Sequence, residues 1–394
     1  MFDRIKEEII DLRQEMSNLR RDFHQHPELG MEEKRTAGVV ANLLKGLGLK
    51  VRTEVGKTGV VGLLEGKGPG KTLLLRADMD ALPIQEENNV PYCSQNKNVM
   101  HACGHDGHMA ILLTVARVLT AHRKDFPGFV KFVFQPGEEG FGGARLMIED
   151  GVLKEPPVNA ALALHLINRL PLGILGLRGG PTMACMDDFT IHIKGKGGHA
   201  ANPEEAVDAI LMSAQVISAL QSLVSKEVSP LTPLVVHVGT IHGGNAFNIV
   251  ADKVQLKGTV RTHDENLRRS MPERMDRIVK GVTEALRGIH ELDYQFGYPP
   301  VINDLVINKF VAGAASKVAA VKNTVEIPLS MASDDMAFFL KEVPGSYFFV
   351  GAANAEKALN KPLHNSMFDF DEEALIIGAE TIARAAFAYL IDGC

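Results

Sequence analysis

Three segments within residues 76–165 concentrate acidic, thiol and imidazole side chains, the groups that hold metal ions and move protons. They read RADMDALP, HACGHDGH and PGEEG, and a further histidine follows in ALALHL. Cys103 and His105 stand two residues apart, so in an extended segment their side chains point the same way and can reach one ion. This inventory indicates a hydrolytic site with two metal ions.

Three of the adjacent glutamate pairs in the sequence differ in their surroundings. Glu138 and Glu139 directly follow an apolar stretch and are flanked by glycines, which let the backbone approach a ligand. One such carboxylate can bind a metal while the other takes the proton of an attacking water. We therefore interpret this pair as functional, and we expect Glu86–Glu87 and Glu372–Glu373 to be solvated surface pairs.

Two other histidine patterns favour structural roles. His24 and His26 in FHQHPELG have the spacing of a metal-binding pair, but no acidic or thiol cluster is left over to join them. We interpret them as part of a turn at a helix end, before Pro27. His108 follows His105 by one helical turn, and we expect it to support the site or to be a satisfied buried histidine.

The first part of the chain alternates predicted helices and strands. Helices are expected at 2–24, 32–47, 109–121 and 142–150, and strands at 60–64, 72–76, 129–135 and 160–165. This order predicts an α/β layered domain with a mixed sheet. Asp78, Glu138 and His165 then lie at or just after strand ends, which meet at one edge of such a sheet.

From about Met183 the pattern changes. Strands are expected at 188–194, 234–241, 253–262 and 292–296, with helices at 203–225 and 266–288. This β-α-β-β-α-β order is the ferredoxin-like α+β arrangement, which can fold as an inserted domain. We predict one discontinuous domain, 1–182 and 299–394, and an insert at 183–298. Asp371 is expected to cap a last helix at 372–391.

Composition excludes several classes of function. The 394 residues carry a formal net charge of -6 and 45% hydrophobic residues, which does not suit a nucleic-acid-binding surface. The start reads as a charged amphipathic helix, and no run approaches the roughly 18 apolar residues of a membrane span. Only four scattered cysteines occur, among them Cys394, which we expect to be an exposed thiol. These features predict a cytoplasmic protein that binds neither nucleic acid nor membrane.

Six motifs together resemble the two-metal amidohydrolase and aminoacylase family of metallopeptidases. They are RADMDALP, HACGHDGH, QPGEEG, GKGGHAANP, FNIV and LHNS, and they follow the family order along nearly the entire chain. The branch includes hippurate hydrolases, N-acyl-L-amino-acid amidohydrolases and auxin-conjugate hydrolases. The resemblance implies a layered catalytic domain and an inserted lid and dimerisation domain.

The resemblance also implies roles for individual residues of the first domain. Cys103 becomes the ligand that bridges two divalent metals. The remaining ligands are His105 and His165 for one metal, and Glu139 and His364 for the other. Glu138 becomes the general base, and Asp80 orients a ligand or the base. Thiolate and imidazole ligands favour zinc. Because members of the family also work with other metals, manganese is the next candidate, followed by cobalt or nickel.

In the insert, His199 resembles the histidine that stabilises the oxyanion and reaches the active site from a partner subunit. This implies a homodimer or a higher oligomer, formed through the insert. Asn248 and Arg261 resemble the pair that holds the substrate, and an arginine fork suits a free carboxylate. Asp78 occupies a position where related peptidases carry a histidine ligand.

The expected function is metal-dependent hydrolysis of the amide bond of an N-acyl-L-amino acid, of the hippurate or N-acetyl type, to a carboxylic acid and a free amino acid. Two alternatives stay open: a metal-dependent dipeptidase, and a small-molecule-binding relative without catalysis. A dipeptidase needs an acidic clamp for the free α-amine, and the sequence offers no identifiable one.

Overall fold

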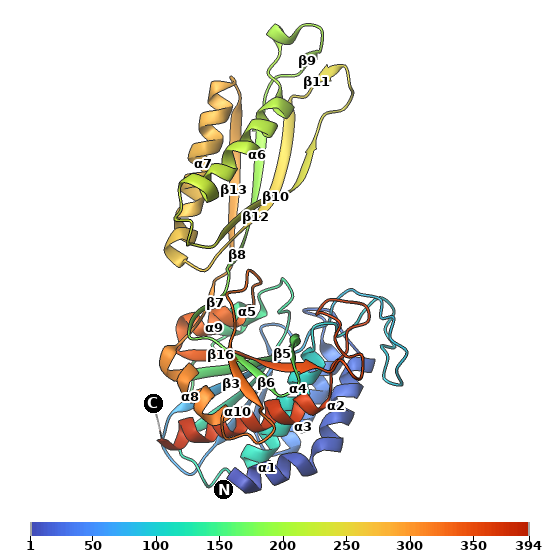
Figure 1. Cartoon of the computed structure of the whole chain (residues 1–394), viewed down its shortest axis with the longest axis vertical. Coiled ribbons are helices and arrows are strands. Elements are labelled where there is room, and N and C mark those ends of the chain that lie inside the picture. The colour runs from blue at the N-terminus through green and yellow to red at the C-terminus, as the bar shows by residue number, and fades with distance from the viewer. Residues whose placement is uncertain (1, 393–394) are drawn as a thin grey trace. The chain divides into compact units, whose positions relative to one another are not determined.

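The computed structural model describes residues 2–392, so Cys394 lies outside the described part of the chain. The chain forms two compact units (Figure 1), each of which we describe by itself. The first unit comprises Met1–Gly180, Ile302–Pro328 and Asp335–Cys394, and the second comprises Pro181–Val301 and Leu329–Asp334. We expected 299–394 to lie wholly in the first unit. The segment 329–334 instead groups with the second, where the Ser330 and Ala332 carbonyls both accept the Ala184 N–H.

The first unit is built on a mixed eight-stranded sheet with the order β1-β2-β4-β3-β5-β16-β6-β15. Its strands are β1 (Lys50–Val55), β2 (Gly59–Glu65), β3 (Thr72–Asp78), β4 (Phe129–Gln135), β5 (Ala160–Pro171), β6 (Ile174–Leu177), β15 (Asn323–Glu326) and β16 (Gly345–Ala353). The central strands β4, β3, β5 and β16 run parallel to one another. All seven residues of β3 are buried, and its three consecutive leucines are typical of a parallel strand covered on both faces.

Helices cover this sheet. They are α1 (Phe2–Asp11), α2 (Arg13–Gln25), α3 (Lys34–Gly46), α4 (His105–Ala121), α5 (Gly143–Glu149), α8 (Leu305–Ala315), α9 (Met336–Glu342) and α10 (Glu373–Asp392). Helix α4 contacts β3, β4, β5 and α10, and it is buried over most of its length. The structure thereby encloses the start of α4, which carries His105, within the first unit.

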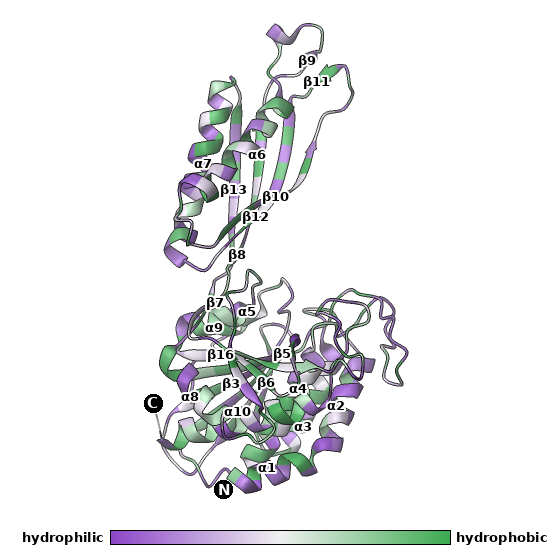
Figure 2. Ribbon diagram, viewed as in Figure 1, coloured by the Kyte–Doolittle hydropathy of each residue, from purple (hydrophilic) through white to green (hydrophobic). Residues whose placement is uncertain are grey.

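The second unit contains a four-stranded antiparallel sheet with the order β10-β12-β8-β13. Its elements are β8 (Met186–Lys194), β9 (Gly198–His199), η1 (Pro203–Glu205), α6 (Ala209–Lys226), β10 (Leu234–Gly243), β11 (Ile249–Val250), β12 (Lys253–Thr262), α7 (Glu265–Ala285) and β13 (Ile289–Tyr298). Short strands β7 (Gly180–Met183) and β14 (Val301–Asn303) lie where the chain passes between the units. Hydrophobic and hydrophilic residues mix along the strands of the second unit (Figure 2). In β8, Phe189, Ile191 and Ile193 point into the hydrophobic core of this unit.

Most predicted elements are present, with shifted ends. The predicted first helix is two helices, α1 and α2, separated at Leu12. The predicted cap is present, since Asp371 Oδ1 accepts the Glu373 N–H at 3.1 Å. Strand β5 runs six residues beyond His165, to Pro171, because β16 continues to pair with it. His165 therefore lies inside a strand and not at its end.

Two helices have the length and mean composition of a membrane span. They are α6 and α10, and 89% of the apolar window of α10 is buried inside the protein. Core helices of globular proteins satisfy the same criteria, because a helix surrounded by other elements is apolar on all sides. The apolar sequence of α10 is thus explained by its packing in the first unit.

Candidate metal and catalytic site

The predicted metal-binding residues of the first unit gather at one place. Ligand atoms of Cys103, His105 and His165 lie within 4.8 Å of one another, and so do those of Cys103, Glu139 and His364. The Cys103 Sγ is 3.4 Å from His165 Nε2, and His364 Nε2 is 3.1 Å from Glu139 Oε1. Cys103 is common to both groups, so the structure offers two adjoining ligand sets that share one thiol.

The local backbone differs from the extended segment that we expected around Cys103. Gly104 has a left-handed φ of 86°, which residues with a side chain rarely adopt. His105 is the first residue of α4. A turn at Gly104, directly before the helix, therefore brings the side chains of Cys103 and His105 together. His364 also has a left-handed φ, 64°, and its N–H donates to the Ala102 carbonyl at 2.8 Å. This bond holds the His364 loop beside Cys103.

Hydrogen bonds fix the tautomers of two histidines. The Nδ1 of His105 is 2.8 Å from the Asp80 carbonyl, and the Nδ1 of His165 is 2.7 Å from the Leu166 carbonyl. A carbonyl only accepts, so each Nδ1 carries a hydrogen, and Nε2 is the ring nitrogen left for a metal once it is deprotonated. Among residues 2–392 the buried Nε2 of His105 has no hydrogen-bond partner. Such an orphaned ring nitrogen, beside a thiol and carboxylates, fits a metal ligand.

Asp80 holds the turn that carries the paired glutamates. Its two carboxylate oxygens accept the backbone N–H groups of Glu138, at 3.0 Å, and Glu139, at 2.9 Å. The buried Glu33 adds a third contact, because its Oε1 accepts the Gly137 N–H at 2.8 Å. Asp80 was predicted as an orienting carboxylate, whereas nothing in the sequence distinguished Glu33. The main chain of the Glu138–Glu139 turn is thus clamped from two sides.

The electrostatics of the cluster favour a bound cation. Burial, together with the carboxylates of Glu139 and Glu138, raises the pKa of the Cys103 thiol well above its ordinary value. Burial alone would lower the pKa of His105, but Asp78, Asp80 and Glu139 raise it to about 10. Negative charge contributes to both shifts, beside burial in the case of Cys103, and a divalent ion neutralises such charge. The donors present, one thiol, three imidazoles and carboxylates, fit divalent metals.

A second cluster lies beside the first. Asp78, His105 and His108 place ligand atoms within 4.8 Å of one another, and all three residues are buried. Burial would raise the pKa of Asp78, but Arg76, His105 and His108 hold it well below its ordinary value. Asp78 is therefore a carboxylate, with Arg76 Nη1 at 2.7 Å from its Oδ2.

The predicted substrate and oxyanion residues belong to the second unit. His199 on β9 pairs with Ile249 on β11, and its Nδ1 accepts the Ala201 N–H at 3.0 Å. The backbone of Asn248 joins the same loop pair, since its carbonyl accepts the Ala200 N–H at 3.1 Å. Arg261 lies elsewhere, on β12, and its Nη1 donates to the Met331 carbonyl. Within this unit, His199 and Asn248 are neighbours and Arg261 is held apart from them by the strand.

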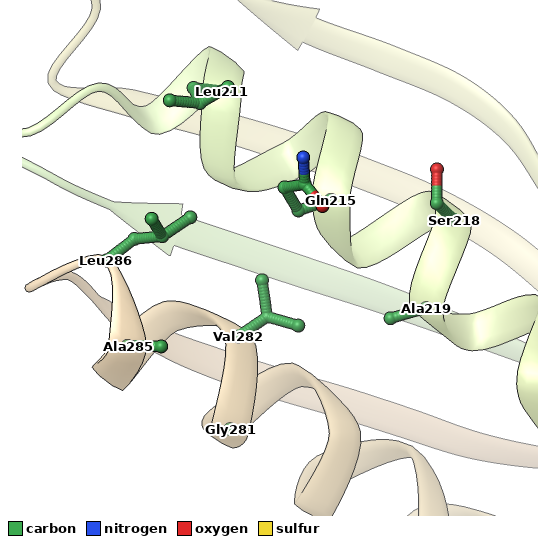
Figure 3. A pocket seen from close by; sticks show the side chains of 8 residues that line it. All are labelled: Leu211, Gln215, Ser218, Ala219, Gly281, Val282, Ala285 and Leu286. Carbon is green, nitrogen blue, oxygen red and sulfur yellow. The ribbon is translucent and has the colours of Figure 1, made fainter.

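The second unit also has a groove between α6 and α7 (Figure 3). It is lined by Leu211, Gln215, Ser218, Ala219, Gly281, Val282, Ala285 and Leu286. None of these eight side chains is a metal ligand of the usual kinds or titrates near neutral pH, so the groove offers no comparable chemistry.

Glu86 contradicts the expectation of a solvated glutamate pair. It is buried, and its carboxylate binds His24 Nε2 at 3.1 Å and the Ser94 N–H at 2.7 Å. The other ring nitrogen of His24 lies 2.8 Å from Asp106 Oδ2. The partners of His24 were thus present in the sequence, but the fold was needed to bring them together.

Comparison with known proteins yields one family and full-length relatives. A sequence model of the peptidase family M20/M25/M40 matches residues 74–388. An N-acyl-L-amino acid amidohydrolase of Geobacillus stearothermophilus is 45% identical over 302 residues, which are 76% of this chain and 81% of the relative. An N-acetylcysteine deacetylase of Bacillus subtilis is 36% identical, over 95% of this chain and 96% of the relative. The crystal structure of the Bacillus subtilis YXEP protein, described as a dinuclear metal binding peptidase from the M20 family, has a TM-score of 0.85 and 32% identity, and covers 96% of this chain and 99% of that one.

Proposed function

Because this chain belongs to the peptidase family M20/M25/M40, we propose that it is a metal-dependent amidohydrolase that cleaves the amide bond of N-acyl-L-amino acids. The predicted family resemblance is confirmed by these comparisons. Relatives that align with most of the chain are named for the hydrolysis of N-acyl amino acids. The products are a carboxylic acid and a free amino acid.

One observation carries this proposal: two ligand sets share Cys103 and lie beside a glutamate whose backbone is clamped. We assign Cys103 as the bridging ligand of two divalent ions. His105 and His165 complete one set, and Glu139 and His364 complete the other. Zinc or manganese suits these donors, and cobalt or nickel is the alternative.

Glu138 is assigned as the general base and then the general acid. When bound, the metals supply Lewis acidity toward the amide carbonyl and lower the pKa of water. Glu138 takes the proton of the attacking water and returns it to the leaving nitrogen. Asp80 keeps Glu138 in place through the backbone bonds of the turn. The neighbouring Glu139 contacts His364 and would hold the metal of that ligand set, so the two carboxylates would have different roles.

We assign the second unit as the inserted ferredoxin-like lid and dimerisation domain. Its sheet order and its β-α-β-β-α-β sequence of main elements support this. His199 would stabilise the oxyanion from a partner subunit, and Asn248 and Arg261 would hold the substrate near its carbonyl and carboxylate. The assembly is then a homodimer or a larger oligomer in the cytoplasm, and its substrate is a small molecule.

Replacement of Glu138 by glutamine tests the catalytic assignment. Glu138→Gln should keep two metals per chain and reduce turnover of N-acetyl and N-benzoyl amino acids by several orders of magnitude, since the amide cannot accept the proton. Glu139→Gln should instead lower metal content. Glu149→Gln, on the exposed surface of α5, is the matched control and should leave both properties unchanged.

Three results would contradict the proposal. Near-normal turnover by Glu138→Gln would exclude this residue as the base. Cleavage of dipeptides but of no N-acyl amino acid would favour the dipeptidase, and absence of any cleavage by a metal-loaded protein would favour a binding relative.

A further inference from the structure

His108 makes two buried hydrogen bonds that define its tautomer. Its Nε2 accepts the backbone N–H of Leu166 at 2.9 Å, and its Nδ1 lies 2.6 Å from Asp78 Oδ1. Because an N–H only donates, Nε2 has the lone pair, and Nδ1 carries the hydrogen that is donated to Asp78. Both ring nitrogens are therefore engaged. His108 offers no free lone pair to a metal, although it lies beside His105 and Asp78.

The Leu166 N–H needs this acceptor because strand β3 stops pairing with β5 before Leu166 is reached. Strands β3 and β5 pair only as far as Arg76 and Ala163, while β5 continues past His165. Leu166 pairs with β16 on one side but lies beyond the last residue that pairs with β3, in a buried part of the strand. His108 accepts the hydrogen bond that a neighbouring strand would otherwise accept, and a buried N–H without a partner is costly.

The other partner of His108 is itself fixed. Arg76 Nη1 lies 2.7 Å from Asp78 Oδ2, and Arg76 Nε donates to Gln135 Oε1 at 2.8 Å. Arg76 Nη2 also donates to Asp335 Oδ1 at 3.1 Å. This buried chain orients the Asp78 carboxylate toward His108 and neutralises much of its charge, which opposes a role for Asp78 as a metal ligand.

We propose that His108 is a positioning residue that fixes the metal ligand His165 of β5 relative to the metal ligand His105 of α4. His108 sits on α4 one turn after His105, and its bond reaches the residue next to His165. The rings of His108 and His165 also meet edge to face, with centroids 4.6 Å apart. The proposal rests on the two-metal function proposed above and adds a role for His108 and Asp78 to it.

The test compares zinc binding by His108→Leu, His108→Gln and Asp78→Asn with the wild-type chain. Leucine removes both hydrogen bonds, whereas glutamine can restore an acceptor for Leu166. We expect His108→Leu to bind zinc about 10- to 100-fold more weakly, as loss of a residue that orients a ligand typically does. His108→Gln should recover part of that affinity. Asp78→Asn retains an acceptor for His108 Nδ1–H and should keep two zinc ions.

Two readouts do not depend on turnover. Zinc affinity is measured by competition with a chromophoric chelator, and zinc content by elemental analysis after dialysis. Cobalt-loaded protein should show a thiolate charge-transfer band from Cys103, and the band should shift in His108→Leu. His122→Leu is the matched control: His122 follows the other end of α4, bonds Glu8 and Asp125, and should change neither readout. Circular dichroism of the metal-free variants monitors folding.

The outcomes separate this inference from the function on which it rests. A folded His108→Leu with wild-type zinc affinity and cobalt spectrum would overturn the role of His108. Loss of one zinc in Asp78→Asn would show that Asp78 is a ligand. If His108→Leu does not fold, wild-type zinc affinity of His108→Gln together with an unshifted cobalt band in that variant would overturn the inference. A wild-type chain that binds fewer than two zinc ions would instead refute the two-metal proposal itself.

Discussion

Asp80 provides the sharpest test of how the site positions its base. Its carboxylate accepts the N–H groups of Glu138 and Glu139, and these bonds hold the turn that presents both side chains. The carbonyl of Asp80, which accepts from His105, survives any change of its side chain. A substitution should therefore disturb the base more than the metal ligand His105.

The magnitude follows from the two bonds. A hydrogen bond to a charged group contributes about 1.5–3 kcal/mol, so the carboxylate contributes about 3–6 kcal/mol, of which water can replace a part in Asp80→Ala. If about 3 kcal/mol is lost from the positioning of Glu138, the rate falls about 100-fold, since each 1.36 kcal/mol is tenfold. Asp80→Asn keeps one acceptor but turns an amide donor toward the other N–H. We expect Asp80→Asn to raise the activation free energy by at least half as much as Asp80→Ala does.

The assay measures kcat and KM for an N-acetyl amino acid, zinc content, and the free energy of unfolding in urea. Asp150→Asn is the matched control, because the Asp150 carboxylate also accepts a backbone N–H, that of Gly56 at 2.7 Å, but outside the site. We expect Asp80→Ala to lose kcat and stability while zinc content stays at two. Retention of kcat within about threefold, or loss of zinc without a specific loss of rate, would refute the reasoning.

Two further predictions concern pH and metal. Burial would raise the pKa of Glu86, but His24 and the Ser94 N–H lower it from 4.5 to about 2, so its contribution to stability is present above about pH 4.5 and is lost as the pH falls toward 2. Glu86→Gln should flatten the loss of urea stability in that window, and an unchanged slope would argue against the buried pair. Removal of metal by a chelator should lower stability, and zinc at a free concentration 1,000-fold above its Kd should restore about 4 kcal/mol. Cys103→Ala should lose most of that gain in urea or calorimetric unfolding, and a full gain would exclude Cys103 as a bridging ligand.

Local patterns were sufficient for much of the fold. The apolar run of β3, the alternation along β8 and the cap at Asp371 each follow from neighbouring residues, and all three are present. Errors arose where a non-local contact decided the outcome. His165 lies within β5 because β16 extends the pairing, and sequence periodicity does not contain that partner.

The candidate site shows the same division. The types and order of Cys103, His105 and Glu138 were enough to predict a metal-dependent hydrolase. The turn at Gly104 was missed, because the spacing of Cys103 and His105 fits an extended segment and does not reveal the left-handed glycine between them. Glu86 was misplaced, since a pair of glutamates has the same local pattern on a surface as in a buried contact with a distant histidine.

The sequence by itself determined the chemical inventory, the family and the approximate elements, because residue types, spacing and periodicity are local properties. Only the tertiary structure decided which atoms of that inventory are free to bind a metal. Among residues 2–392 the Nε2 of His105 is left without a hydrogen-bond partner, whereas that of His108 accepts the Leu166 N–H. That difference depends on where β3 stops pairing with β5, a contact between segments more than 80 residues apart.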